Sequence, residues 1–412
     1  MIGNPPYVQL QDDGGKLAEM YKPAKFNTFN RMGDIYQLFY EKGIALLRKD
    51  GHLCYITSNK WMRAGYGETS RKYFAEQTQP KILIDLAGEK VFENATVDVN
   101  ILLLQKAAYT QNTYALRGGL ECLKDRSGLA KQAVQAIKFP KNGNNWVILS
   151  DIEQRIKQKI EAVGTPLKEW NIKIYRGILT GCNEAFIINK EKRDELIKKC
   201  PKSAEIIRPI LRGRDIKRYS YDFAELYLLN VHNGIREKNI PLVNIDDYPA
   251  IKTHLDQYWD KISVRDDRGK TPYNLRNCAY MDDFNKQKII WTDIACKPSF
   301  VFSDKEIYFL NTAYMLSGHH LYYLLHILNS KLITFYFTHT ATGLGNKGLR
   351  LFKIFVEKIP IPVYVNSDIQ RSLDSYKPVI NLQSEQEKIN KWVNQLYHLN
   401  TEEIGYINSI SE

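Results

Sequence analysis

Cysteine is scarce and scattered in this chain of 412 residues. The six cysteines include no C-x-x-C pair, which excludes a finger-type zinc site and favours free thiols in a reducing compartment. No run approaches about eighteen consecutive apolar residues, and no basic-then-apolar leader opens the chain, so neither a membrane span nor secretion is expected. We expect a cytoplasmic protein of globular composition, with 44% hydrophobic and 25% charged residues.

Two short motifs lack the context that their chemistry requires. Residues 343–348 have the spacing G-x-G-x-x-G, but they follow an expected helix, and no acidic residue lies about 20 positions further on within a βαβ unit. His319 and His320 have no cysteine or carboxylate at ligand spacing. No Pro-Asp is followed by Glu-x-Lys. We therefore expect no dinucleotide site, no metal and no nuclease centre.

Positive charge is concentrated in the middle of the chain. Residues 111–365 hold 40 Lys and Arg against 27 Asp and Glu, whereas residues 1–110 hold 14 against 12 and residues 366–412 hold 4 against 7. A long basic block with interleaved tyrosines is typical of proteins that bind the phosphate backbone of nucleic acids. A lysine-rich solvated surface gives the same counts, so charge alone leaves both interpretations open.

The first part of the chain has the pattern of an α/β domain. Asp34, with Gln37 three residues later, can cap a helix whose apolar residues recur on one face. Strands that alternate with such helices predict an open sheet with helices on its faces, which we expect over residues 1–110. The expected strands span residues 52–57, 81–86 and 97–104.

Three further segments are expected. Residues 111–166 form a polar linker that ends in a helix at 151–163, because apolar residues there recur at helical spacing. Residues 167–365 form a β-rich α+β domain with a few helices, such as one at 321–333, and residues 366–412 form a helical tail. The strand-like runs of the β-rich domain are 172–179, 184–189, 226–230, 288–294, 299–303 and 307–311.

The most distinctive feature is Asn4-Pro5-Pro6-Tyr7, directly after a short expected strand. Two adjacent prolines fix φ and remove two backbone donors, so the carbonyls here have no local partners. With one amide side chain and one aromatic ring, they can accept the hydrogens of an amino group and cover the ring that bears it. A plain proline turn after an edge strand is the alternative interpretation.

This motif resembles the catalytic motif of amino-group methyltransferases that use S-adenosylmethionine. In that family the Asn side-chain oxygen and the carbonyl of the first proline accept both hydrogens of an exocyclic amine. The nitrogen lone pair is thereby localised, and the amine attacks the sulfonium methyl without a strong base. The resemblance implies catalytic roles for Asn4, Pro5, Pro6 and Tyr7, with Tyr7 stacked on an extruded base.

The family's later landmarks follow in order, at residues 34–51, 52–62 and 85–106. By this resemblance, Phe92 is a second aromatic residue against the flipped base, and Phe39 covers the adenine of the cofactor. Burial in the helix core explains Phe39 equally well. Enzymes that methylate glutamine in proteins share the motif, so the substrate has to be inferred from the rest of the chain.

The second half resembles the TaqI-like target-recognition domain of type IIG restriction–modification enzymes. With the catalytic motif first and the recognition domain last, the order is that of gamma-class methyltransferases, whose typical target is adenine N6. The resemblance implies a partial Rossmann-like methyltransferase sheet, and a site-specific enzyme that flips an adenine out of duplex DNA. The segments that carry it are IYRGILTGCNEAF (174–186), ILRGRDI (210–216), WTDIACKPSFVFSD (291–304), HILNSK (326–331) and KIPIPV (358–363).

Several side chains of the second half suit DNA contact. Arginine presents a planar fork to phosphate or to a guanine edge, and a glycine-rich loop can approach a backbone closely. A surface salt bridge explains any one arginine as well, whereas nucleic acid explains the group better. The residues expected at DNA are Arg176, Thr180, Asn183, Arg212, Arg214, Arg218, Lys297, Lys347 and Arg350.

One part of the family pattern is absent ahead of Asn4. A complete enzyme has there a strand, glycine loop and helix for the methionine part of S-adenosylmethionine, and an acidic residue for the ribose. A type IIG enzyme also has a nuclease domain upstream. We therefore expect a fragment of a longer enzyme, or an upstream polypeptide that carries the cofactor-binding and nuclease parts, and no activity from this chain alone.

Two other functions remain open at this point. The chain can be a DNA-recognition subunit or fragment without chemistry of its own. It can also be a methyltransferase that acts on an amine or amide of protein or RNA. The basic, β-rich second half argues against the protein or RNA substrate, but it does not separate a recognition subunit from an enzyme.

Overall fold

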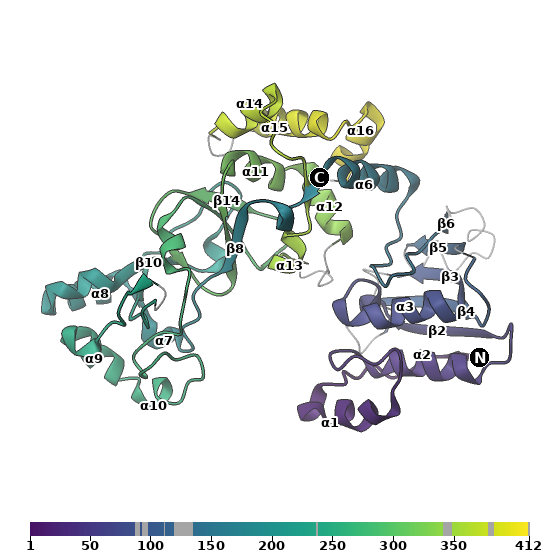
Figure 1. Cartoon of the computed structure of the whole chain (residues 1–412), viewed down its shortest axis with the longest axis horizontal. Coiled ribbons are helices and arrows are strands. Elements are labelled where there is room, and N and C mark those ends of the chain that lie inside the picture. The colour runs from purple at the N-terminus through teal and green to yellow at the C-terminus, as the bar shows by residue number, and fades with distance from the viewer. Residues whose placement is uncertain are drawn as a thin grey trace. The chain divides into compact units, whose positions relative to one another are not determined.

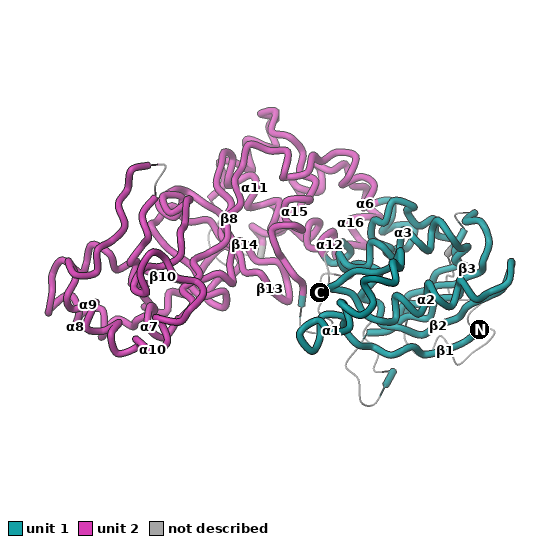
Figure 2. The backbone as a smooth tube through the Cα atoms, turned by 60° about the horizontal axis from the view of Figure 1, so that its bottom comes forward, with its two compact units in different colours: residues 1–155, 338–348 teal, residues 156–337, 349–412 magenta. Residues whose placement is uncertain are grey.

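The computed structural model describes residues 1–86, 91–92, 98–110, 112–118, 135–235, 238–340, 348–377 and 383–410. The chain divides into two compact units (Figure 2). Unit 1 comprises residues 1–155 and 338–348, and unit 2 comprises residues 156–337 and 349–412. The expected helical tail is thus grouped with unit 2, whereas domain boundaries at residues 110 and 166 stay predictions.

Unit 1 contains a six-stranded sheet in the order β1-β2-β4-β3-β5-β6 (Figure 1). Strand β1 pairs in parallel with β2, and β4 runs antiparallel between β2 and β3. Strands β1, β2 and β3 therefore point in the same direction, and their carboxyl ends lie at one edge of the sheet. The bounds are β1 (Ile2–Gly3), β2 (His52–Ser58), β3 (Gln79–Asp85), β4 (Val99–Gln105), β5 (Thr113–Arg117) and β6 (Gln135–Ile137).

Helix α2 (Ile35–Leu46) packs closely against this sheet. It begins with the predicted capping box, in which Asp34 and Gln37 exchange side chain-to-backbone hydrogen bonds. The approach is close at Gly43, where a Cβ atom would lie 3.0 Å from the Tyr55 hydroxyl and would press on this side chain. The core beside α2 is aromatic and includes Tyr40, Trp61, Phe74 and Trp146, all buried. The other α-helices of this region are α1 (Asp12–Tyr21) and α3 (Glu68–Gln77).

The sequence predicted β2, β3 and β4 correctly but missed two strands. Residues 113–117 and 135–137 were expected in a linker, whereas they form β5 and β6 and extend the sheet. In β5, Thr113 and Ala115 are buried and Tyr114 is exposed. The strand has five residues, and the alternation stops at Leu116, which is buried next to Ala115, so no period-two pattern stands out from the polar neighbourhood.

Unit 2 contains two four-stranded sheets, in the orders β14-β12-β16-β8 and β15-β10-β11-β9. Strands β12, β14, β16 and β8 are antiparallel neighbours, and two short ribbons pair β13 with β17 and β18 with β7. The bounds are β7 (Thr165–Pro166), β8 (Ile172–Arg176), β9 (Ile187–Asn189), β10 (Ile207–Leu211), β11 (Leu226–Leu229), β12 (Lys288–Thr292), β13 (Ile294–Ala295), β14 (Phe300–Ser303), β15 (Tyr308–Phe309), β16 (Ala313–Gly318), β17 (Leu349–Arg350) and β18 (Pro360–Ile361).

Two expected elements of unit 2 differ from the structure. Half of the strand expected at 184–189 is a short helix, α7 (Asn183–Phe186). The helix expected at 321–333 is two helices, α11 (Leu321–Leu328) and α12 (Lys331–Thr340), and at their junction the Ser330 hydroxyl accepts a hydrogen bond from the Ile333 N–H. The helix predicted at 151–163 is confirmed as α6 (Asp151–Val163). Further helices are α8 (Lys190–Lys199), α9 (Pro249–Asp256), α10 (Trp259–Ile262) and α13 (Lys353–Val356).

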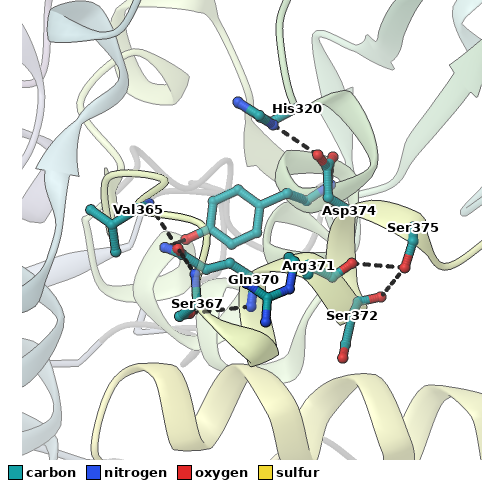
Figure 3. A network of polar contacts seen from close by, with 9 residues as sticks. His320, Val365, Ser367, Gln370, Arg371, Ser372, Asp374 and Ser375 are labelled. Carbon is teal, nitrogen blue, oxygen red and sulfur yellow. Dashed lines mark hydrogen bonds and ion pairs between the residues drawn. The ribbon is translucent and has the colours of Figure 1, made fainter.

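The tail is helical, as predicted, and its first helix packs against α11. His320 Nδ1 and Asp374 Oδ2 lie 2.7 Å apart, and Gln370 accepts hydrogen bonds from the backbone N–H groups of Val365 and Ser367 (Figure 3). The tail helices are α14 (Asp368–Ser375), α15 (Gln383–Leu396) and α16 (Thr401–Ser409). No helix of the described residues is long and apolar enough to cross a membrane.

Candidate functional site

The Asn4–Tyr7 motif leaves β1 at the edge where the parallel strands end. Asn59 follows β2 at the same edge, and Asp85 ends β3 there. The Asn59 side-chain amide donates to Asp85 Oδ1 at 2.8 Å. Ligands of open α/β sheets bind outside the carboxyl ends of the strands. The fold therefore places the motif where a sheet of this kind carries its chemistry.

Tyr7 is held as a neutral aromatic group. Its hydroxyl donates to the Ile56 carbonyl at 3.2 Å, and burial raises the pKa of Tyr7 to about 12. Its ring meets Tyr36 edge-on, with centroids 6.1 Å apart, and tilts against Phe92 at 6.3 Å and 57°. Tyr7 therefore offers a ring face and does not serve as a base near neutral pH.

Asn4 and Pro5 supply acceptors without partners among the described residues. Asn4 is exposed, whereas Pro5 is buried. No hydrogen bond reaches the Asn4 side chain or the Pro5 carbonyl from the part of the chain that the structure describes. A buried acceptor without a donor costs about 1–3 kcal/mol. An incoming amino group that donates to the carbonyl of buried Pro5 would remove that cost, and at the oxygen of exposed Asn4 it would replace solvent.

Backbone bonds fix the segment that follows the motif. The Ile35 N–H donates to the Val8 carbonyl at 2.9 Å, which ties the motif's exit to the start of α2. Asp34 caps this helix and accepts from the Tyr66 hydroxyl at 3.1 Å. Burial raises the pKa of Asp34, and the hydrogen bond from Tyr66 opposes that shift. The position of Asn4–Tyr7 relative to α2 is thereby set by the fold.

Phe39 does not lie in the helix core. It is 41% exposed on α2, which excludes the core interpretation that the sequence left open. Strand β1 ends the sheet order, so it has a neighbour on one side only among the described strands. Ile2 of β1 is 87% exposed. Phe39 and the outer edge of β1 are thus both accessible in unit 1.

In unit 2, the structure brings together arginines that are distant in the sequence. Arg176 Nε donates to the Asn311 carbonyl at 2.6 Å. A Cβ atom on Gly213 would lie 2.7 Å from Thr292 Oγ1, so the turn that carries Arg212 and Arg214 packs against the end of β12. Arg350 lies opposite Ile294 in the β13–β17 ribbon. These segments meet around residues 292–294 and 311–312.

Three of the residues expected at DNA are engaged within the protein. Arg212 donates to Asp215 from Nε and Nη2, at 3.0 and 2.7 Å. Arg218 donates to the Asn329 carbonyl. Thr180 is 1% exposed, and its hydroxyl donates to Asn183 at 2.6 Å. Thr180 thus holds its own loop and has no surface to offer, whereas Asn183 is exposed.

The remaining expected residues differ in what surrounds them. Arg214, Lys297 and Arg350 are exposed, and Lys347 lies outside the described residues.

The sequence did not single out Arg265, which is buried and donates to the carbonyls of Thr180, Asp267, Pro272 and Asn274. Main-chain acceptors leave no pattern in a sequence, so no signal pointed to this residue. It holds the loop that contains Thr180.

Two family profiles match this chain. Residues 1–92 match the Eco57I restriction-modification methylase family, and residues 208–361 match the TaqI-like C-terminal specificity domain. The matched regions thus resemble a restriction–modification methylase segment followed by a specificity domain. The first match contains Asn4–Tyr7 and the landmarks at 34–51 and 52–62, and the second contains the segments 210–216, 291–304 and 326–331, whereas the segment 174–186 lies outside both.

Similar proteins are type II methyltransferases. The chain is 22% identical to M.BstVI of Geobacillus stearothermophilus over 100% of its own length and 75% of that protein, and 23% identical to M.PaeR7I of Pseudomonas aeruginosa over 98% and 71%. Its fold resembles that of the type IIL restriction-modification enzyme MmeI, solved in complex with DNA, with a TM-score of 0.58 and 13% identity. The match covers 100% of this chain and 56% of the MmeI chain, so the chain spans little more than half of that protein.

Proposed function

We propose that this chain is the catalytic-motif and target-recognition part of a site-specific DNA methyltransferase in a restriction–modification system. The enzyme transfers a methyl group from S-adenosylmethionine to N6 of an adenine that is flipped out of duplex DNA. The observation that carries the proposal is the position of Asn4–Tyr7 at the carboxyl edge of the sheet, with two acceptors unoccupied by the described residues and Tyr7 beside Phe92.

The residues of unit 1 act on the amino group. Asn4 Oδ1 and the Pro5 carbonyl accept its two hydrogens, which draws the nitrogen out of conjugation with the ring. Tyr7, anchored on the Ile56 carbonyl, stacks on the base, and Phe92 bounds the site from a second direction. Pro6 fixes the backbone between Asn4 and Tyr7. No general base is required, because the methylated nitrogen loses its proton to water afterwards.

The described residues supply only part of a binding site for S-adenosylmethionine. Phe39 offers an exposed aromatic face that can cover an adenine ring. The described residues include no glycine loop between a strand and a helix with an acidic residue behind it, which is the usual support for such a cofactor. When bound, the cofactor supplies an electrophilic methyl group. We propose that most of its binding residues belong to a segment that pairs with the open edge of β1.

The principal alternative is a DNA-recognition subunit or fragment without chemistry of its own. It is favoured because the described residues include no glycine loop with an acidic residue behind it, which is the usual support for the methyl donor. A methyltransferase that acts on protein or RNA is the further alternative. The 22–23% identity to type II methyltransferases over nearly the whole chain supports a DNA substrate over a protein or RNA substrate.

A product analysis tests the proposal. The chain is completed with a cofactor-binding segment, in cis or as a partner polypeptide, and incubated with tritiated S-adenosylmethionine and duplex DNA, RNA or protein. The DNA is digested to nucleosides, which are separated by chromatography. We expect the label in N6-methyladenine. Label in another base, in RNA or in protein would contradict the proposal, and DNA binding without any transfer would favour the recognition subunit.

A further inference from the structure

We propose that Arg176 reads a guanine in the target sequence, and that Asp293 beneath it is its positioning carboxylate. This inference rests on the proposed function, since it names the residue through which unit 2 selects a DNA sequence. The sequence alone does not distinguish Arg176 from the other exposed arginines, whereas its surroundings in the structure do.

The Arg176 guanidinium is fixed on one side and open on the other. Its Nε donates to the Asn311 carbonyl at 2.6 Å, and its Cζ lies 5.7 Å from the centroid of the Tyr314 ring. The side chain is nevertheless 51% exposed. Because Nε is anchored, the outer edge with its two Nη groups is pre-oriented and loses little conformational entropy on binding.

The Asp293 carboxylate attracts the Arg176 guanidinium but accepts no hydrogen bond from it. Its Oδ2 lies 3.9 Å from Arg176 Nη2, which is too far for a hydrogen bond, and its side chain is 14% exposed. Two backbone bonds hold its position, from its own N–H to the Thr312 carbonyl and from the Leu351 N–H to its carbonyl, both at 2.8 Å. The charge attraction therefore acts from a fixed point, while the N–H groups of Arg176 remain available to a ligand.

Three other arginines of unit 2 that the sequence singled out for DNA differ from Arg176 in this respect. Both Nε and Nη2 of Arg212 are used by Asp215, and Arg218 donates to the Asn329 carbonyl. Arg214 is exposed, and its side chain has no hydrogen bond or ion pair with any described residue. The mobile side chain of Arg214 needs no fixed geometry to contact a phosphate, whereas the anchored fork of Arg176 has the fixed geometry that a two-bond contact with a base edge uses.

Guanine is the base that matches the free edge of Arg176. Its major-groove edge presents two acceptors, O6 and N7, which take two parallel N–H donors. Adenine presents one acceptor and one donor there, so it leaves one arginine N–H unpaired. Asp293 directly precedes β13, which pairs with β17, and a major groove admits a two-stranded β-ribbon.

The test uses the whole 412-residue chain and a library of randomised DNA duplexes. Bound duplexes are selected and sequenced for the wild type, R176A, R176K, D293N, R214A and R371A. The wild type should enrich a sequence with at least one fixed guanine. R176A and R176K should lower the preference for that guanine by roughly 10- to 100-fold and leave the other positions unchanged.

The other variants serve as controls. D293N should weaken the same guanine preference less than R176A does. R214A should reduce affinity for all sequences and lower the salt slope by about one. R371A changes an exposed arginine of α14 paired with Asp368, so it should change nothing. Circular dichroism and the melting temperature report whether each variant is folded, and R176K retains the charge if R176A does not fold.

Each outcome separates the inference from the proposed function. If the wild type enriches a sequence and R176A with R176K keep every preference, Arg176 does not read a base, whereas the proposed function stands. A uniform loss of affinity in both variants would assign Arg176 to a phosphate and overturn the inference. A wild type that binds DNA without enriching any sequence would overturn the inference together with the recognition part of the proposed function.

Discussion

The rings of Tyr7 and Phe92 lie 6.3 Å apart at an angle of 57°, although the two residues are distant in the sequence. Rings at this angle form a corner and not a parallel slot, so a planar base can stack on only one of them. Tyr7 is the better platform, because its hydroxyl is anchored on Ile56 and its edge is supported by Tyr36. Phe92 then limits how far the base can move.

A pair of Tyr7 variants tests this arrangement in the completed enzyme. Tyr7→Ala should weaken retention of a flipped base by about 1–3 kcal/mol, the usual contribution of one base–aromatic stack. Tyr7→Phe keeps the ring and loses only the hydrogen bond to Ile56, so it should cost much less. The fluorescence of 2-aminopurine at the target position measures the flipped population. Equal effects of both variants would mean that the hydroxyl, and not the stack, matters.

The sequence predicted the strands β2, β3 and β4 and the capped helix α2 of unit 1, because their signals are local. The capping box of Asp34, the apolar strands and the proline pair all lie within a few residues of the structure that they specify. The surroundings of Arg176 could not be predicted in this way. Its partners Asp293, Asn311 and Tyr314 come from loops and strands far along the chain, and one of them contributes a backbone carbonyl. Such contacts follow from sheet pairing, which no short pattern encodes.

DNA binding by the full chain should depend strongly on salt. The net charge of +13 in residues 111–365 lies largely within unit 2, and neutralising about five to eight phosphates gives a slope of log K against log salt of roughly −4 to −7. Fluorescence anisotropy with a labelled duplex between low and moderate salt measures this slope. An affinity that is flat over this range would contradict phosphate binding by the basic segment.

These 412 residues alone should bind little S-adenosylmethionine and transfer no methyl group. The described residues offer Phe39 and the open edge of β1, but no glycine loop with an acidic neighbour for the rest of the cofactor. Calorimetry with the cofactor and a tritiated-methyl assay check the two parts. Adding a cofactor-binding segment is the positive control. Tight binding by the chain alone would show that unit 1 holds a cofactor site by itself.

Lys288 should make the stability of unit 2 depend on pH. Its side chain is 0% exposed and donates to the carbonyls of Phe284, Lys286 and Lys305, while burial lowers its pKa to about 8. The unfolded lysine binds its proton up to about pH 10.4, so between these values the unfolded state holds more protons and stability rises with pH. Urea unfolding measures the free energy of unfolding of the wild type and of Lys288→Met. Between pH 8 and pH 10, the value for the wild type should rise by roughly 1–3 kcal/mol relative to that of the variant. A constant difference would contradict the lowered pKa.

The central claim is that Asn4–Tyr7 is the site of methyl transfer, and the single-turnover transfer rate of Asn4→Ala tests it most directly. The completed enzyme, pre-bound to its DNA, is mixed with tritiated S-adenosylmethionine, and the formation of N6-methyladenine is followed for the wild type and the variant. Loss of one positioned polar group at a reacting centre should lower the rate by about 10²- to 10³-fold, while the affinity for DNA stays unchanged. An Asn4→Ala enzyme that transfers methyl groups at the rate of the wild type would remove the motif from the mechanism.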